Sequence, residues 1–107
     1  MAHELLGPVE EISLDLINVD DNRRLLDLEH VKVLEESIRE RGLISPIAVY
    51  ALLPTPRYRL LAGRHRFHAC KRLGLTTINA RVYTHPLNSY ELKAIEVYEN
   101  LHRKNLT

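Results

Sequence analysis

The segment from Ala62 to Gly74, AGRHRFHACKRLG, concentrates the side chains best suited to bind an anion: three arginines, one lysine and two histidines. Arginine presents a fork of N–H donors that matches phosphate or carboxylate oxygens. Gly63 follows an apolar run, and glycine lets a backbone approach a ligand closely. If a helix begins after Gly63, its first N–H groups also attract negative charge. The segment therefore predicts a phosphate-binding turn at a strand-to-helix junction.

The charges are distributed unevenly along the chain. No Asp or Glu lies between Glu40 and Glu91, whereas this interval contains eight Arg or Lys residues. The first 40 residues contain eleven acids and four bases, so the formal net charge of +1 hides this asymmetry. The asymmetry indicates an anionic partner for the middle of the chain. The alternative is that an acidic N-terminal helix lies against the basic segment and neutralises it.

The expected helix after Gly63 has an apolar side formed by Phe67, Ala69, Cys70 and Leu73, and Arg66 falls inside this arc. A guanidinium is not buried without a partner, so we expect Arg66 to reach an anion beyond the helix start or a carboxylate elsewhere. Cys70 is expected to be a small core residue and not a reactive thiolate.

A second group of candidate residues lies in YENLHRKN, where Glu99 and Arg103 are four residues apart. They form either an exposed ion pair or a site in which Glu99 holds a divalent cation, or Arg66, while Arg103 binds phosphate. His65 and His68 have no further ligand at metal-site spacing, so we do not expect a zinc site and assign His65 as a donor to phosphate.

Alternating apolar and polar residues predict the strands of the domain. The expected strands are residues 10–17, 46–52, 57–62 and 76–84. In the last of these, Ile78, Ala80 and Val82 should share one face.

Three helices should complete the domain. Apolar residues spaced three and four apart predict a helix from Leu28 to Arg41, with Asp27 as its N-cap and Gly42 after its end. A second helix is expected from Arg64 to Leu73, with Gly74 as its cap. The third is expected over 89–104, after a capping box of Asn88 and Glu91, with Tyr90, Ala94, Val97 and Leu101 on its apolar face. The prediction is a small α+β domain with a mixed sheet and three main helices.

The size and composition fit one small domain in a reducing compartment. A chain of 107 residues has room for one core. Its apolar stretches are too short to cross a bilayer, and its N-terminus lacks the order of a signal peptide. A single cysteine cannot form an internal disulfide, which favours the cytoplasm. Because the sequence stops within a charged helical segment, we expect a fragment of a longer protein.

Three segments, LEESIRERGLISPIAVY, YRLLAGRHRFHACKRLG and ENLHRKNLT, resemble in order and spacing the N-terminal domain of the ParB family of partition proteins, whose fold is shared with the sulfiredoxins. The resemblance covers roughly residues 9–107. It implies a ParB/sulfiredoxin-like fold that binds CTP or a related nucleoside triphosphate with Mg²⁺. It also implies weak hydrolysis, clamp-like closure of a homodimer on DNA, and a following helix-turn-helix domain, with no membrane partner.

The resemblance also implies roles for individual residues. By position, the phosphate-binding turn is Gly63, Arg64, His65 and Arg66. The second phosphate box is Glu99, Asn100 and Arg103, with Glu99 near the magnesium ion. Ser45, Pro46 and Ile47 would lie beside the base and sugar.

The chain departs from the family at the turn. Partition proteins usually have Gly-Glu-Arg-Arg there, whereas here Arg64 replaces the glutamate tied to hydrolysis and His65 replaces an arginine. Sulfiredoxins have Gly-Cys-His-Arg, and Arg64 occupies the place of the nucleophilic cysteine. We therefore expect a nucleotide-binding switch module with at most weak hydrolysis, in a DNA-binding protein of partition or transcriptional regulation.

Two other functions remain open on the sequence. One is direct nucleic-acid binding, with or without nuclease activity, through the basic segment. The other is a small-molecule phosphotransferase, in which Glu99 or Glu96 would be the base.

Overall fold

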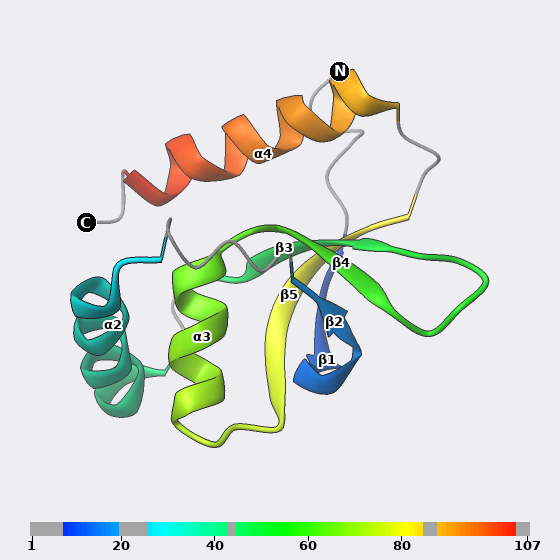
Figure 1. Ribbon diagram of the computed structural model, residues 1–107. Helices are drawn as coiled ribbons and strands as arrows, with labels where there is room; N and C mark the ends of the chain where they lie inside the picture. The colour runs from blue at the N-terminus through cyan, green and yellow to red at the C-terminus, as the bar shows by residue number, and fades with distance from the viewer. Residues whose placement is uncertain (1–7, 20–25, 43–44, 85–87, 105–107) are drawn as a thin grey trace.

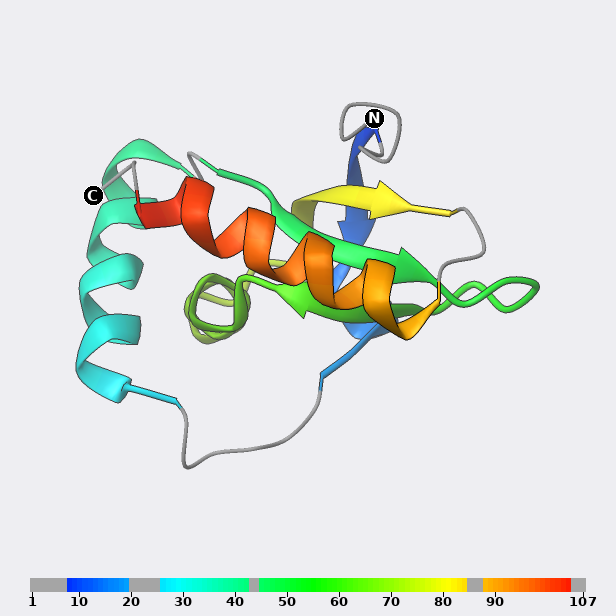
Figure 2. The ribbon, with the colours of Figure 1, turned by 90° about the horizontal axis from the view of Figure 1, so that it is seen from above.

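A mixed sheet of five strands forms the centre of the computed structural model, which describes residues 8–19, 26–42, 45–84 and 88–104, with side chains of the last helix as far as Glu99. Helix α3 (Arg64–Arg72) packs against one face with α2 (Leu28–Arg41) beside it, and α4 (Ser89–Lys104) lies across the other face (Figures 1 and 2). None of the helices in these ranges is both long and apolar enough to cross a lipid bilayer.

The strands have both parallel and antiparallel neighbours. They are β1 (Val9–Ser13), β2 (Ile17–Asn18), β3 (Ile47–Ala51), β4 (Tyr58–Ala62) and β5 (Thr77–Tyr83), in the order β1-β5-β3-β4-β2. The pairs β1/β5 and β3/β4 are antiparallel, whereas β3/β5 and β2/β4 are parallel. The predicted α+β domain with a mixed sheet and three main helices is confirmed.

The prediction of one strand over residues 10–17 is wrong in its second half. Residues Leu14–Leu16 form a 3-10 helix between β1 and β2, and the N–H of Leu14 donates to the Thr76 carbonyl at 3.0 Å. The two edges of a flat five-stranded sheet lie about 19 Å apart, but the four steps from Ser13 to Ile17 span at most about 14 Å. Because β1 and β2 are the two edge strands, the sheet must curl to bring its edges together.

Helices α2 and α4 begin as predicted. The Asp27 side chain accepts hydrogen bonds from the backbone N–H groups of Glu29 and His30, at 3.0 and 3.3 Å. The capping box before α4 forms in both directions: Glu91 Oε1 accepts the Asn88 N–H at 3.0 Å, and Asn88 Oδ1 accepts the Glu91 N–H at 2.8 Å. Both caps satisfy N–H groups that a helix leaves open at its start.

Helix α3 ends at Arg72, one residue before its predicted end. Leu73 is the cap residue, and Gly74 follows with φ +80°. Gly74, which we predicted as the cap, therefore follows the cap residue instead.

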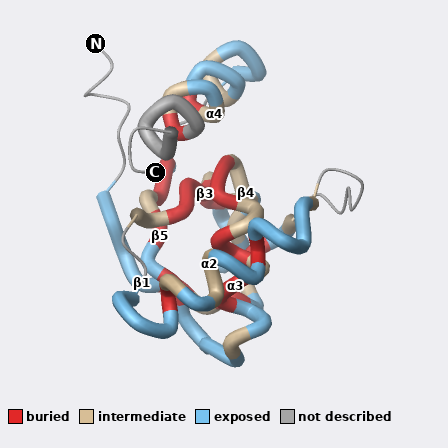
Figure 3. Tube along the Cα trace, turned by 90° about the vertical axis from the view of Figure 1, so that its left-hand side faces the viewer, coloured by how far each residue is buried: buried red, intermediate tan, exposed pale blue. Residues whose placement is uncertain are grey.

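Alternate residues of the sheet contribute to two cores, which appear as the buried segments of Figure 3. The predicted shared face of Ile78, Ala80 and Val82 packs toward α2 and α3. Cys70 is fully buried in that core, as predicted. A smaller core beneath α4 consists of Ala48, Ala62, Tyr83 and Ile95.

Helix α4 packs on the sheet with a face other than its most apolar one. Ile95 and Glu99 are buried, whereas Tyr90 is 83% exposed and Val97 is 48% exposed. Ala94 is exposed as well, and the Leu101 side chain, also predicted for the apolar face, lies outside the described residues. The expectation that the apolar face of an amphipathic helix packs on its domain is therefore wrong for Tyr90, Ala94 and Val97. The sheet instead contacts the face with Ile95 and the Glu99 carboxylate.

Candidate functional site

The junction between β4 and α3 can accommodate only a glycine at residue 63. Gly63 has φ +98° and ψ 31°, a left-handed conformation that side chains disfavour. A Cβ atom there would lie 2.7 Å from Ile47 Cγ2 and 3.1 Å from Ile47 Cβ. The Gly63 carbonyl accepts the N–H of Phe67 at 2.8 Å and so begins the α3 hydrogen-bond ladder. The first turn of α3 is thereby held directly against the start of β3.

Arg66 connects this turn to the segment before β3. Its side chain is buried, and Nη1 donates to the carbonyl oxygens of Ser45 and Pro46, both at 2.8 Å. These backbone acceptors are neither of the two kinds of partner that we expected from the sequence. They join the predicted turn to the predicted base-and-sugar segment.

His65 contacts the N-terminus of α2. Its Nε2 accepts the backbone N–H of Asp27 at 3.0 Å, and its ring meets that of His30 edge to face, with centroids 4.9 Å apart. Because Nε2 is an acceptor here, the predicted donation from His65 to a phosphate must come from Nδ1. Arg64, the first residue of α3, is partly exposed beside it.

Glu99 is buried against β5, where two residues of the strand contact the same carboxylate oxygen. Tyr83 Oη donates to Glu99 Oε2 at 2.9 Å, and Arg81 Nε lies 3.4 Å from that oxygen. Burial, followed by the charge of Glu99, raises the pKa of Tyr83 above its ordinary value near 10, so the hydroxyl remains a donor. The sequence predicts a cation or Arg66 as the partner of Glu99, whereas the contacts of its carboxylate in the described part of the chain are with Arg81 and Tyr83.

The residues at this site fit a cation that is bound mainly through a ligand's phosphates. Within the described ranges, no three His, Cys, Asp or Glu side chains come together as a metal site. Mg²⁺ is commonly held by one or two carboxylates together with substrate phosphates, and Glu99 offers one. The other members of the predicted second box, Asn100 and Arg103, belong to α4, but their side chains lie outside the described residues.

The alternative of internal charge neutralisation applies at the far end of α3. Arg72 is the last residue of that helix, and its Nε pairs with Glu35 of the acidic helix α2. Arg57 donates through Nε to Asn18 Oδ1 at 2.8 Å and through Nη2 to the Asp15 carbonyl at 3.4 Å. These contacts occupy basic side chains that lie away from the Gly63–Arg66 turn.

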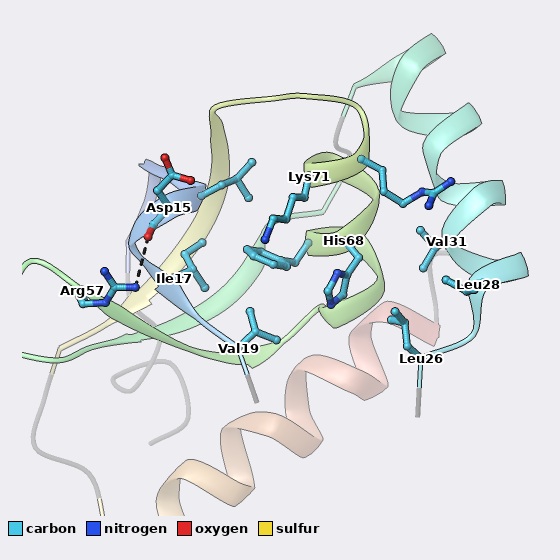
Figure 4. Close-up of a pocket in the computed structure, with 12 residues that line it drawn as sticks. Asp15, Ile17, Val19, Leu26, Leu28, Val31, Arg57, His68 and Lys71 are labelled. Carbon is cyan, nitrogen blue, oxygen red and sulfur yellow. Dashed lines mark hydrogen bonds between the residues drawn. The ribbon is translucent and has the colours of Figure 1, made fainter. Parts of the chain in front are cut away.

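A separate cavity of about 770 Å³ lies between α3, the start of α2 and the β1–β2 segment (Figure 4). It is bordered by apolar side chains together with Asp15, Arg57, His68, Lys71 and Arg72. Lys71 Nζ lies 5.9 Å from the centroid of the Phe67 ring. No residue of the Gly63–Arg66 turn lines this cavity. Some basic side chains of this segment thus lie at the turn and others at the cavity. The sequence did not indicate these two separate locations.

Sequence comparison finds relatives among partition and nucleoid occlusion proteins. The chromosome-partitioning protein ParB of Caulobacter vibrioides is 33% identical over 109 residues, covering 96% of this chain and 34% of that protein. A nucleoid occlusion protein of Listeria monocytogenes is 35% identical over 109 residues, covering 100% of this chain and 37% of that protein. The chain thus spans about a third of the length of these curated relatives.

Structure comparison agrees with the sequence comparison and confirms the predicted ParB/sulfiredoxin-like fold. A C-terminally truncated ParB from Caulobacter crescentus, complexed with CTP-gamma-S, has a TM-score of 0.72 at 28% identity over 90% of this chain and 54% of that one. Sulfiredoxin from Arabidopsis thaliana has a TM-score of 0.66 at 35% identity over 74% of this chain and 88% of that one. The ParB N-terminal domain family matches residues 4–101, and the chain belongs to that family.

Proposed function

We propose that this domain binds the phosphates of CTP or a closely related nucleoside triphosphate at the Gly63–Arg66 turn, as the switch module of a ParB-like DNA-binding protein. The observation that carries the proposal is the left-handed Gly63 packed on Ile47, with Arg66 bonded to the carbonyls of residues 45 and 46. This arrangement fixes the N-terminus of a cationic helix, with its open N–H groups, against the start of β3, and helix N-termini bind anions. The CTP-gamma-S complex of the related Caulobacter protein supports the choice of nucleotide.

Different residues of the chain would bind different parts of the nucleotide. The first turn of α3, with Arg64, would bind phosphate oxygens, and Ser45, Pro46 and Ile47 would line the base and sugar. Mg²⁺ would neutralise part of the phosphate charge when bound. Glu99 would hold it, with Asn100 and Arg103 completing the second phosphate box.

We infer binding with little or no turnover. Arg64 occupies the position at which the family resemblance places the glutamate tied to hydrolysis. The Glu99 carboxylate is held by Arg81 and Tyr83, and Glu96 Oε1 accepts a hydrogen bond from Lys93 Nζ at 2.8 Å. A phosphotransferase needs a carboxylate available as general base, so the burial and contacts of Glu99 weigh against that residue in this role, whereas the exposed pair of Glu96 and Lys93 does not weigh against Glu96.

Sulfiredoxin chemistry is also disfavoured, although the fold is shared. Cys70 is fully buried, and burial raises the pKa of its thiol, an effect that the positive charge of Arg66 offsets in part. A nucleophilic cysteine needs an accessible thiolate.

The proposal extends to a homodimer and to DNA. The exposed stripe of Tyr90, Ala94 and Val97 on α4 offers an apolar surface to a second copy. Since the chain spans about a third of its relatives, we propose that DNA recognition, for partition or transcriptional regulation, belongs to a following domain.

Isothermal titration with CTP, ATP and GTP, each with and without Mg²⁺, tests the proposal. We expect the wild type to bind CTP, and Arg64→Ala to weaken binding at least about tenfold through the lost charge-assisted hydrogen bonds. Arg59→Ala is the matched control because it removes one arginine from the exposed part of β4. Equal losses in both variants would show that general charge, and not the turn, attracts the ligand, and absence of binding by the wild type would refute the proposal.

Direct nucleic-acid binding by this domain makes a different prediction. Its affinity would fall steeply with salt, with a slope set by the number of phosphates contacted. It would also depend about equally on Arg59 and Arg64. A gel shift series over ionic strength with these two variants separates it from binding at the turn.

A further inference from the structure

We propose that Arg81 and Tyr83 restrain the Glu99 carboxylate and thereby set how much divalent cation the domain needs in order to bind nucleotide. The inference rests on the proposed function, because it concerns the carboxylate assigned there to the cation. It assigns Arg81 and Tyr83 as positioning residues that act through Glu99.

The two residues form a rigid surface for Glu99. They are two positions apart on β5, so their side chains project from the same face of the strand. Strand β5 lies inside the sheet, between β1 and β3, and Tyr83 is only 2% exposed. Its ring packs with Ala62, the residue before Gly63, and with Ile95 of α4. The Tyr83 ring is therefore fixed in the core beneath α4, which also contains the residue before the proposed phosphate turn.

Both contacts use one oxygen of Glu99. Tyr83 Oη lies 2.9 Å and Arg81 Nε 3.4 Å from Oε2, while the side chain as a whole is buried. A cation that coordinates this oxygen competes with the hydroxyl donor, and a cation on either oxygen of the carboxylate approaches a guanidinium of like charge. Both effects oppose cation binding, and both are stronger in a buried site than in water.

The same two contacts stabilise the Glu99 carboxylate in its buried position. A buried carboxylate without partners is costly, so Glu99 depends on Arg81 and Tyr83 when no cation is bound. The cation and the two strand residues thus compete for one carboxylate. Removing a contact from Arg81 or Tyr83 to Glu99 should therefore increase the affinity of Glu99 for the cation.

The test is a Mg²⁺ titration at fixed CTP with the full chain, read as bound nucleotide by equilibrium dialysis. We expect Tyr83→Phe, which removes one hydrogen bond to a charged acceptor, to lower the half-saturating Mg²⁺ concentration roughly tenfold. Arg81→Gln should lower it by a similar factor. Matched controls are Tyr90→Phe, on the exposed side of α4, and Arg39→Gln, whose partner Glu36 lies 3.3 Å away in an exposed ion pair.

Each outcome decides the inference. A lower Mg²⁺ requirement in both β5 variants, with the controls unchanged, supports it, and Tyr83→Phe suffices if Arg81→Gln fails to fold. A purely structural role would lower the thermal stability of Tyr83→Phe without moving the Mg²⁺ half-saturation point, and that result overturns the inference while the proposed function stands. If the wild type binds no CTP with or without Mg²⁺, both fail together.

Discussion

Replacing Gly63 with alanine tests whether the backbone at residue 63 packs as tightly against Ile47 as the structure shows. Two terms contribute to the cost. A side chain in the left-handed region costs about 1–2 kcal/mol. The new Cβ would also lie 2.7 Å from Ile47 Cγ2 and 3.3 Å from Arg66 Nη2, and overpacking of this kind costs about 1–3 kcal/mol. We therefore expect Gly63→Ala to lose about 2–5 kcal/mol of the free energy of unfolding.

Gly74→Ala is the matched control because it isolates the contact term. Gly74 has a similar left-handed φ of +80°, but a Cβ there meets nothing within 4 Å. The gain from a less flexible unfolded chain applies to both variants and cancels in their difference. Urea unfolding followed by circular dichroism should therefore place Gly63→Ala about 1–3 kcal/mol below Gly74→Ala.

Equal losses in the two variants would refute the close contact between residue 63 and β3. A double-mutant cycle with Ile47→Ala sharpens the result because that change removes the Cγ2 atom closest to the new Cβ. The two substitutions together should cost less than the sum of their separate costs, with a coupling of about 1 kcal/mol.

Three further outcomes follow from the side chains around the site. The Cys70 thiol, buried and with its pKa raised, should resist iodoacetamide at pH 8 in the folded chain and react after urea unfolding, as mass spectrometry would show. Asp27→Ala removes the acceptor of two backbone N–H groups of α2 and should lower the unfolding free energy by about 1 kcal/mol in thermal melts, with Asp27→Asn close to wild type. In an alkaline ultraviolet titration, the Tyr83 hydroxyl should ionise above its ordinary pKa near 10. Since its folded pKa lies above the unfolded value near 10, its contribution to stability is complete below that pH and is lost as pH rises further.

Much of the framework could be predicted from local sequence signals. Asp27 before α2 and the pair of Asn88 and Glu91 before α4 are caps whose partners lie within three residues, and both formed as expected. The strand over 10–17 was only half right because the alternation of Ile12, Leu14 and Leu16 with polar residues does not distinguish a continuous strand from one that ends in a 3-10 turn. What separates them is the curl of the sheet, a property of the whole fold.

At the candidate site, too, the features formed by neighbouring residues could be predicted and the contacts between distant residues could not. The glycine turn could be recognised because its strand, glycine and cationic helix are contiguous in sequence. The partners of Arg66 and Glu99 could not, because they are about 20 and 16 residues away and depend on how the sheet orders its strands. One usable signal was present: Arg81 and Tyr83 alternate with the apolar residues of β5, which places a cation and a hydroxyl on the sheet face opposite the larger core.

The most direct measurement of the central claim is a ¹H–¹⁵N NMR titration of the full chain with CTP and Mg²⁺. Saturable shifts that are largest at the backbone amides of Gly63, Arg64 and His65 are the expected result. Shifts confined to residues around the cavity of Lys71, His68 and Arg57, or no shifts at millimolar CTP, would contradict the assignment of the phosphate site to this turn.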